Sequence, residues 1–190
     1  LRTGLGMRAD CPIIVCVAMM RQGDKLRSYR LLSEALGRLL DSPWQLLLLG
    51  DGPASDEVDQ AMQALGTRVF RSGLVTPRLL SHWLCGCDLY VWPATEGGGL
   101  QSLLRAQATG TPVVACETPD AVDRVLNGQS GRLAAENAES FSNGISFLLR
   151  HSQFREQYGR QAREIVAAQH DLRPAAEALR GILSRAMPAA

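Results

Sequence analysis

Residues 92–115 read WPATEGGGLQSLLRAQATGTPVVA. The apolar residues 89–92 that lead into this stretch predict a buried strand, and the apolar spacing over residues 100–108 predicts a helix that closes at Gly110. A second apolar strand follows at residues 113–116. Three consecutive glycines before the helix leave backbone N–H groups unobstructed at its positive end, where an anion binds well. The stretch therefore predicts a strand–loop–helix–strand unit of the kind that binds nucleotides.

The same alternation of apolar strands and amphipathic helices extends over most of the chain. Strands are expected at residues 13–18, 44–49, 68–71, 89–92, 113–116 and 131–134, and helices at residues 28–40, 55–65, 77–84, 100–108 and 119–126. Strands joined by helices of this length need right-handed parallel crossovers, which place helices on both faces of the sheet. We therefore expect one doubly wound, Rossmann-like α/β domain over residues 1–190, with a C-terminal helical tail at residues 138–190.

Composition and charge narrow the class of protein. With 190 residues, 46% of them hydrophobic and 21% charged, the chain is long and apolar enough to form one core. A formal net charge of +1 gives no basic excess, so we expect no nucleic-acid partner. Five cysteines without a paired CxxC spacing indicate reduced thiols in a cytoplasmic protein and no metal site. No apolar run approaches the ~20 residues that cross a bilayer.

Three further motifs accompany the opening stretch in a fixed order. They are LLLLGDGP at residues 46–53, VFRSGLV at 69–75 and NGQSGRL at 127–133. Together with the aromatic-Pro strand end and the PVVA strand of the opening stretch, they resemble the C-terminal, donor-binding domain of retaining glycosyltransferases of the GT-B fold (glycosyl transferases group 1). The resemblance covers the chain from about residue 13 to about residue 185.

The resemblance implies a function for the whole protein. A hexose would pass from a UDP- or GDP-sugar to an acceptor with retained anomeric configuration, and neither a metal nor another cofactor would be needed. The acceptor site would belong to an N-terminal domain that this chain lacks, so we expect the domain alone to be inactive. Any peripheral membrane association would run through that absent half.

The loop after the first strand holds the cations that the resemblance assigns to the donor diphosphate. Arg21 takes the first of two basic roles, while Lys25 and Arg27 compete for the second. A charged loop between a strand and a helix is most often merely solvated. Because this loop lies at the carboxyl end of a strand, on the same edge as the glycine run, phosphate binding is the favoured interpretation.

Two further segments complete the expected donor site. The resemblance places backbone donors for the ligand at Gly97, Gly98, Gly99, Leu100 and Gln101, and it places residues beside the nucleotide base at Ser72, Leu74 and Val75. Glycine permits close approach of the backbone to a phosphate, which supports the first of these assignments.

The two acidic residues of the family's E-x7-E motif are not preserved. Without a gap in the alignment, the first falls at Gly97 and the second, which grips the donor ribose, at Arg105. Glu96 misses the first position by one residue and recovers its role only if the loop bulges. Arg105 has no acceptor atom for a ribose hydroxyl proton, although its guanidinium could reach a phosphate.

These departures keep alternative functions open. One is a GT-B domain that has lost catalysis and serves as a binding or scaffolding module in polysaccharide or glycoconjugate assembly. Another is a phosphosugar-binding α/β domain unrelated to glycosyl transfer. NAD binding is disfavoured, because the loop after the first strand contains Gly23 but no Gly-x-Gly-x-x-Gly motif.

Overall fold

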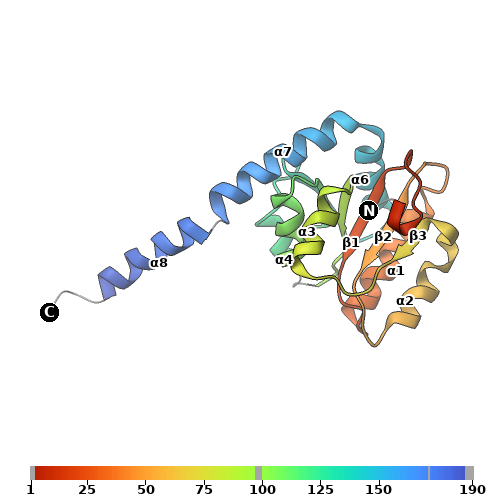
Figure 1. Ribbon diagram of the computed structural model, residues 1–190, viewed down its shortest axis with the longest axis horizontal. Helices are drawn as coiled ribbons and strands as arrows, with labels where there is room; N and C mark the ends of the chain where they lie inside the picture. Colours follow the sequence, from red (N-terminus) through yellow and green to blue (C-terminus); the bar gives the residue numbers. More distant parts are fainter. Residues whose placement is uncertain (1–2, 97–99, 171, 187–190) are drawn as a thin grey trace.

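The computed structural model describes residues 3–96, 100–170 and 172–186. Within them, six parallel strands form one sheet in the order β3-β2-β1-β4-β5-β6 (Figure 1). The strands are β1 (Ile13–Val17), β2 (Gln45–Leu49), β3 (Val69–Arg71), β4 (Leu89–Trp92), β5 (Val113–Cys116) and β6 (Gly131–Ala134). This order is that of a doubly wound Rossmann-like domain, which confirms the predicted fold class.

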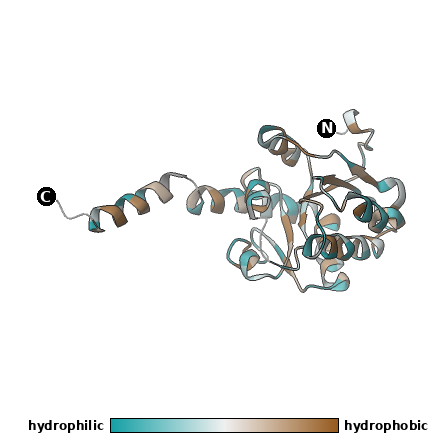
Figure 2. Cartoon of the chain, turned by 90° about the horizontal axis from the view of Figure 1, so that it is seen from below, coloured by the Kyte–Doolittle hydropathy of each residue, from teal (hydrophilic) through white to brown (hydrophobic). Residues whose placement is uncertain are grey.

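Helices cover both faces of the sheet. The helices of the described residues are α1 (Asp24–Gly37), α2 (Ser55–Met62), α3 (Pro77–Cys85), α4 (Leu100–Ala108), α5 (Pro119–Val122), α6 (Ala138–Arg150), α7 (Ser152–Gln169) and α8 (Leu172–Ala186), with short 3-10 turns at Thr3–Leu5 and Gln63–Arg68. Side chains alternate between the faces along each strand, so Ile14 packs under α1, α2 and α6 while Ile13 packs under α3 and α4. Figure 2 shows the hydrophobic strands enclosed between these helical layers.

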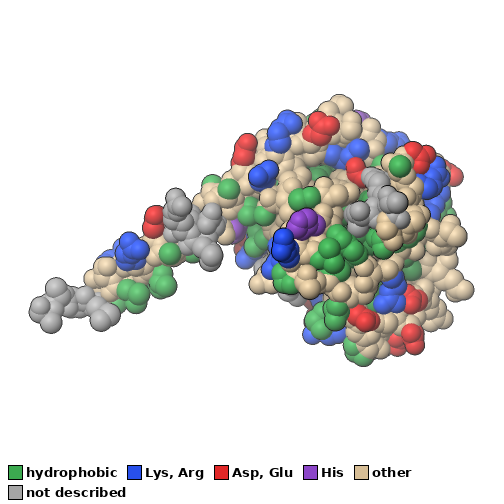
Figure 3. Space-filling view, in the orientation of Figure 1, with side chains coloured by type: hydrophobic (Ala, Val, Ile, Leu, Met, Phe, Trp, Pro, Cys, Tyr) green, Lys and Arg blue, Asp and Glu red, His purple; other side chains and the backbone are tan. Residues whose placement is uncertain are grey.

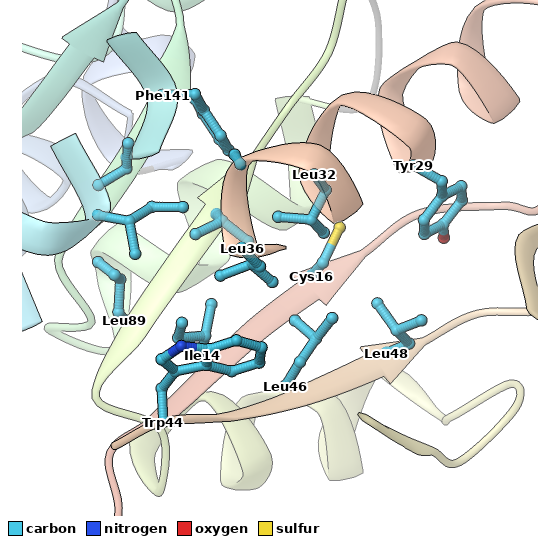
Figure 4. Close-up of a cluster of buried hydrophobic side chains, with 14 of the residues drawn as sticks. Ile14, Cys16, Tyr29, Leu32, Leu36, Trp44, Leu46, Leu48, Leu89 and Phe141 are labelled. Atoms are coloured by element: carbon cyan, nitrogen blue, oxygen red, sulfur yellow. The ribbon is translucent and has the colours of Figure 1, made fainter. Parts of the chain in front are cut away.

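The core under α1 and α6 is built from large apolar side chains. Ile14, Leu46 and Leu89 project from three adjacent strands toward Leu36 of α1 and Phe141 of α6 (Figure 4). All five are fully buried. Strands buried on both faces must be apolar throughout, which is why they read as continuous apolar runs in the sequence.

Several helix boundaries differ from the sequence prediction, among them the end of the helix expected at residues 55–65, which lies at Met62. The helix expected at residues 28–40 begins at Asp24 and ends at Gly37, because Gly23, with φ of 79°, turns the chain into the helix earlier. Lys25 and Arg27 therefore lie in the first helical turn and not in a loop. The helix expected at residues 119–126 ends at Val122.

Turn-type bonds continue after α5 as far as Val125, whose N–H donates to the carbonyl of Ala121 (2.8 Å), and a different bond follows at Leu126. The N–H of Leu126 donates to the hydroxyl of Ser130 (2.9 Å). That bond turns the chain back toward β6 and replaces a helical bond to a carbonyl four residues earlier.

The C-terminal helices form two distinct parts. The helices α6 and α7 pack on the domain, with Ile145 and Tyr158 in its core. In contrast, α8 extends away from the sheet and its covering helices (Figure 1). Its hydrophobic side chains, which include the exposed Leu179, Ile182 and Leu183, gather on one side of the helix (Figure 3). Each helix in the described residues is too short or too polar to cross a bilayer.

Two glycines bring the loops after β1 and β2 into contact. A Cβ atom on Gly50 would overlap the carbonyl oxygen of Ala18, and one on Gly52 would overlap the carbonyl oxygen of Met20. Both glycines have positive φ, 145° and 155°, which L-residues rarely adopt. The close approach allows the N–H of Met20 to donate to the carbonyl of Asp51 (3.0 Å).

We predict that Gly50→Ala lowers the free energy of unfolding by at least about 2 kcal/mol, because both the φ angle and the space are incompatible with a side chain. Urea denaturation followed by circular dichroism measures this change. Gly37→Ala is the matched control, since a Cβ there meets no atom within 4 Å. Equal stability of the two variants would contradict the close approach.

Candidate functional site

The strands β1 and β4 lie side by side, but the helices that follow them cover opposite faces of the sheet. The chain therefore leaves the two neighbouring strand ends in opposite directions and opens a crevice between them. Doubly wound domains bind their ligands at such a switch point, outside the carboxyl ends of the strands.

The backbone at the end of β1 is fixed from several sides. The N–H of Ala18 donates to the carbonyl of Leu49 (3.1 Å), and its carbonyl accepts from the hydroxyl of Tyr29 (2.9 Å). Tyr29 is buried, and burial raises the pKa of its hydroxyl, so this group remains a neutral donor. The floor of the crevice is thus rigid where a ligand would approach it.

The first turn of α4 is attached to the same strand end. The hydroxyl of Ser102 lies 2.8 Å from the buried hydroxyl of Tyr90 and 3.3 Å from the carbonyl of Val17, to which it donates. Burial raises the pKa of Tyr90 as well. These bonds hold the start of α4 against β1 and β4, although residues 17 and 102 are 85 positions apart in sequence.

Lys25 is buried between the ends of the two strands. Its side chain lines a narrow crevice together with Cys16 and Trp92, and its Nζ lies 3.1 Å from a carboxylate oxygen of Asp24. Burial opposes ionisation of Asp24, yet the hydrogen bond and charge of Lys25, aided by the charge of Arg21, lower the pKa of this carboxyl. The ammonium group thus sits at the switch point with one carboxylate partner.

The exposed residues Arg27 and Glu96 form an ion pair, and each lies two residues from a residue that lines this crevice, Lys25 and Ala94. More than half of each side chain remains accessible to solvent. The pair joins the first turn of α1 to the residue just before the glycine run, so these two residues lie close together although they are 69 positions apart. Arg21, in the loop before α1, is exposed.

A cleft of about 320 Å³ opens beside the crevice. Its walls come from the ends of β1 and β2, the loop after β3, the first turn of α3 and the first two turns of α4. The lining residues are Val17, Ala18, Met19, Leu49, Gly50, Leu74, Val75, Pro77, Leu80, Gln101, Ser102 and Arg105. A mostly apolar cleft with a few polar groups at one side is typical of a small-molecule site.

The structure brings most of the expected site residues to this edge. Leu74, Val75, Gln101 and Arg105 line the cleft. Ser72 does not line it, but the N–H of this residue donates to the carbonyl at the end of β2 (3.2 Å) and so helps to place the loop. Gly97, Gly98 and Gly99 lie outside the described residues, and Leu100 is described only as the first residue of α4.

Sequence reasoning missed several residues of the cleft, including Met19, Leu80 and Ser102. Helical spacing signals one of them, because Ser102 lies three residues before Arg105 and so on the same side of α4. Met19 is a half-exposed apolar side chain directly after β1, and nothing in its sequence context marks it as a wall of the cleft.

Comparisons with known proteins find relatives among the glycosyltransferases. A family model described as glycosyl transferases group 1 matches residues 11–151. A GDP-mannose-dependent alpha-(1-6)-phosphatidylinositol monomannoside mannosyltransferase of Mycolicibacterium smegmatis is 32% identical over 161 residues, which are 78% of this chain and 40% of that protein.

Solved structures of similar fold cover nearly the whole of this chain. Sucrose-phosphate synthase from Thermosynechococcus elongatus is 26% identical with a TM-score of 0.81, over 97% of this chain and 47% of that one. Anabaena Alr3699/HepE in complex with UDP-glucose is 21% identical with a TM-score of 0.83, over 97% of this chain and 51% of that one, and shows likeness of fold. This chain thus spans about half the length of the proteins that it matches.

We predict that the ion pair between Arg27 and Glu96 contributes little to stability, because both groups are exposed. A double-mutant cycle of Arg27→Gln and Glu96→Gln, measured by urea denaturation at 0.15 M salt, should give a coupling energy below about 1 kcal/mol. A coupling above that range would mean that the pair holds the fold together.

The cysteines give a second test of the site's geometry. Burial raises the pKa of the Cys16 thiol to about 12, an effect that the nearby charge of Lys25 opposes, and burial with the charge of Glu136 raises that of Cys116 to about 12. Cys85 is exposed.

At pH 8 the native protein should therefore show one rapidly reacting thiol toward a disulfide reagent, because a thiolate is needed for reaction and Cys16 and Cys116 stay protonated. Cys85→Ser should remove the fast phase, and unfolding should release all five thiols. Fast labelling of Cys16 in the native state would show that the crevice is open to its floor.

Proposed function

The chain belongs to the glycosyl transferases group 1 family, and from this premise we propose that it is the donor-binding domain of a glycosyltransferase that moves a hexose from a UDP- or GDP-sugar with retention. The observation that supports the proposal is that Lys25 lines a crevice that shares Ala18 with the cleft, while the neighbouring Arg27 pairs with Glu96 just before the glycine run. Cations beside a small-molecule cleft suit a ligand that carries a diphosphate.

The roles of the basic residues follow from their surroundings. Lys25 is a buried ammonium held by Asp24, and Arg21 is an exposed guanidinium near the same carboxylate. We assign the donor diphosphate to these two cations. Negative charge grows on the diphosphate as the glycosidic bond breaks, and fixed cations there lower the barrier because they need no reorganisation.

Arg27 receives a different role, since it already pairs with Glu96. The pair keeps a carboxylate near the start of α1, where we place the transferred sugar. Glu96 would then accept hydrogen bonds from sugar hydroxyls, and Arg27 would position it. Acceptor binding we assign outside this chain, because the match covers only 40–51% of the length of the relatives.

One observation favours a second candidate, a catalytically inactive scaffold of the same fold. Among the described residues that line the cleft, none is acidic, although the resemblance leads us to expect a carboxylate at position 105. A scaffold that has lost the donor site would show no saturable nucleotide binding.

Calorimetric titration of the 190-residue chain with UDP and GDP tests both proposals. We expect saturable binding of at least one of them. Arg21→Gln should weaken it about tenfold and Lys25→Met by at least as much, since a charge-assisted hydrogen bond contributes about 1.5–3 kcal/mol.

Arg30→Gln is the matched control, because Arg30 lies on α1 but lines a separate surface groove against α2. Thermal melting of each variant shows whether the fold is retained. Absence of binding to both nucleotides in the folded wild-type chain would refute the donor-site proposal and favour the scaffold.

A further inference from the structure

We propose that the cleft prefers a nucleotide whose ribose carries an additional phosphate ester, and that Arg105 is the residue that selects it. The inference rests on the proposed function, since it refines the ligand of the same site. It identifies a substrate class that differs from an ordinary nucleoside diphosphate by one anionic group.

The charge of the cleft is the first observation. Arg105 is the one charged side chain among the cleft's described lining residues, and it is half-buried. Its contact with protein is weak: one guanidinium nitrogen lies 3.4 Å from the carbonyl oxygen of Pro77, at the start of α3. Most of its five N–H donors therefore remain available to a ligand.

The apolar walls around this guanidinium strengthen its attraction for an anion. Met19, Leu74, Val75 and Leu80 line the same cleft. Apolar side chains lower the local dielectric constant, so a charge pair formed there is screened less than one on the open surface. A phosphate would also match the planar, forked geometry of the guanidinium.

Arg105 on α4 lies apart from Arg21 and Lys25, the cations that follow β1. Ala18 lines both the crevice of Lys25 and the cleft of Arg105, so the two basic groups lie on either side of the end of β1. A ligand that spans Ala18 would meet one cation on each side. With the diphosphate at Lys25 and the base within the apolar cleft, the ribose lies between them and its ester would face Arg105.

The chemistry of ribose recognition supports this assignment. A carboxylate accepts hydrogen bonds from the two ribose hydroxyls, whereas an arginine in doubly wound folds accommodates a phosphate on the ribose. Arg105 cannot accept a hydrogen bond at all. A site with an arginine at this position should therefore prefer a phosphate on the ribose, whereas a site with a carboxylate prefers a free hydroxyl.

A competing assignment places Arg105 on the 5′-diphosphate itself. The two assignments predict different effects of a ribose phosphate on the affinity of the nucleotide. If Arg105 binds the diphosphate, a phosphate on the ribose gains nothing, whereas the proposed contact makes it the stronger ligand.

The test compares uridine and guanosine 5′-monophosphates with the corresponding 3′,5′- and 2′,5′-bisphosphates by calorimetry on the 190-residue chain. We expect at least one bisphosphate to bind about tenfold more tightly than its monophosphate, the gain of one charge-assisted contact. Arg105→Gln should abolish this preference and Arg105→Glu should reverse it. Higher salt should reduce the gain in the wild type.

Arg78→Gln is the control variant, since Arg78 lies on the exposed first turn of α3 outside the cleft lining and should leave the preference intact. Equal affinity for mono- and bisphosphates, with UDP or GDP still bound, would overturn the inference and leave the proposed function standing. Loss of UDP and GDP binding in Arg105→Gln without any bisphosphate preference would also overturn it, in favour of the diphosphate contact. If the folded wild type binds no nucleotide, the proposed function itself fails.

Discussion

The contact between the loops that follow β1 and β2 is the constraint on which the rest of the site depends. Gly50 and Gly52 leave no side chain between the two backbones, so the carbonyls of Ala18 and Met20 lie directly against the second loop. Hydrogen bonds from Tyr29 and Ser102 then hold the end of β1 from the opposite sides of the sheet. A ligand that bound at the switch point would meet a surface already ordered, and ordering it would cost little further entropy.

Most of the fold could be predicted from the sequence, because apolar patterns are local. Strands buried on both faces, such as Leu46–Leu49, leave a continuous apolar run, and a helix such as α6 shows its apolar face at Phe141, Ile145 and Leu148. Turn chemistry was harder to anticipate. The start of α1 depends on the φ angle of Gly23, and the turn after α5 depends on a bond from Leu126 to Ser130, neither of which periodicity reveals.

The site could be predicted only in part. Topology predicts that the segments after β1 and β4 lie at one edge of the sheet, because the carboxyl ends of parallel strands meet there. The pairing of Arg27 with Glu96 joins residues 69 apart, and it depends on the helical position of Arg27, which the sequence analysis had placed in a loop. The roles of Lys25 and Arg27 were left in competition for the same reason: burial, which separates them, is a property of the folded chain.

The ion pair also bears on the role of Glu96, which lies one residue before the position at which the family resemblance leads us to expect a glutamate. Gly97 stands where the family resemblance leads us to expect a glutamate, and a carboxylate one residue earlier would ordinarily point elsewhere. Here Arg27 pairs with Glu96, so a side-chain contact from α1 keeps this carboxylate near the start of that helix. Both partners are exposed, so the pair contributes little to stability, and under the proposed function Glu96 still has acceptor lone pairs for sugar hydroxyls while Arg27 positions it. Under the proposed function, a nucleotide-sugar would contact Lys25 through its diphosphate and Glu96 through its sugar, so it should bind more tightly than either of its parts.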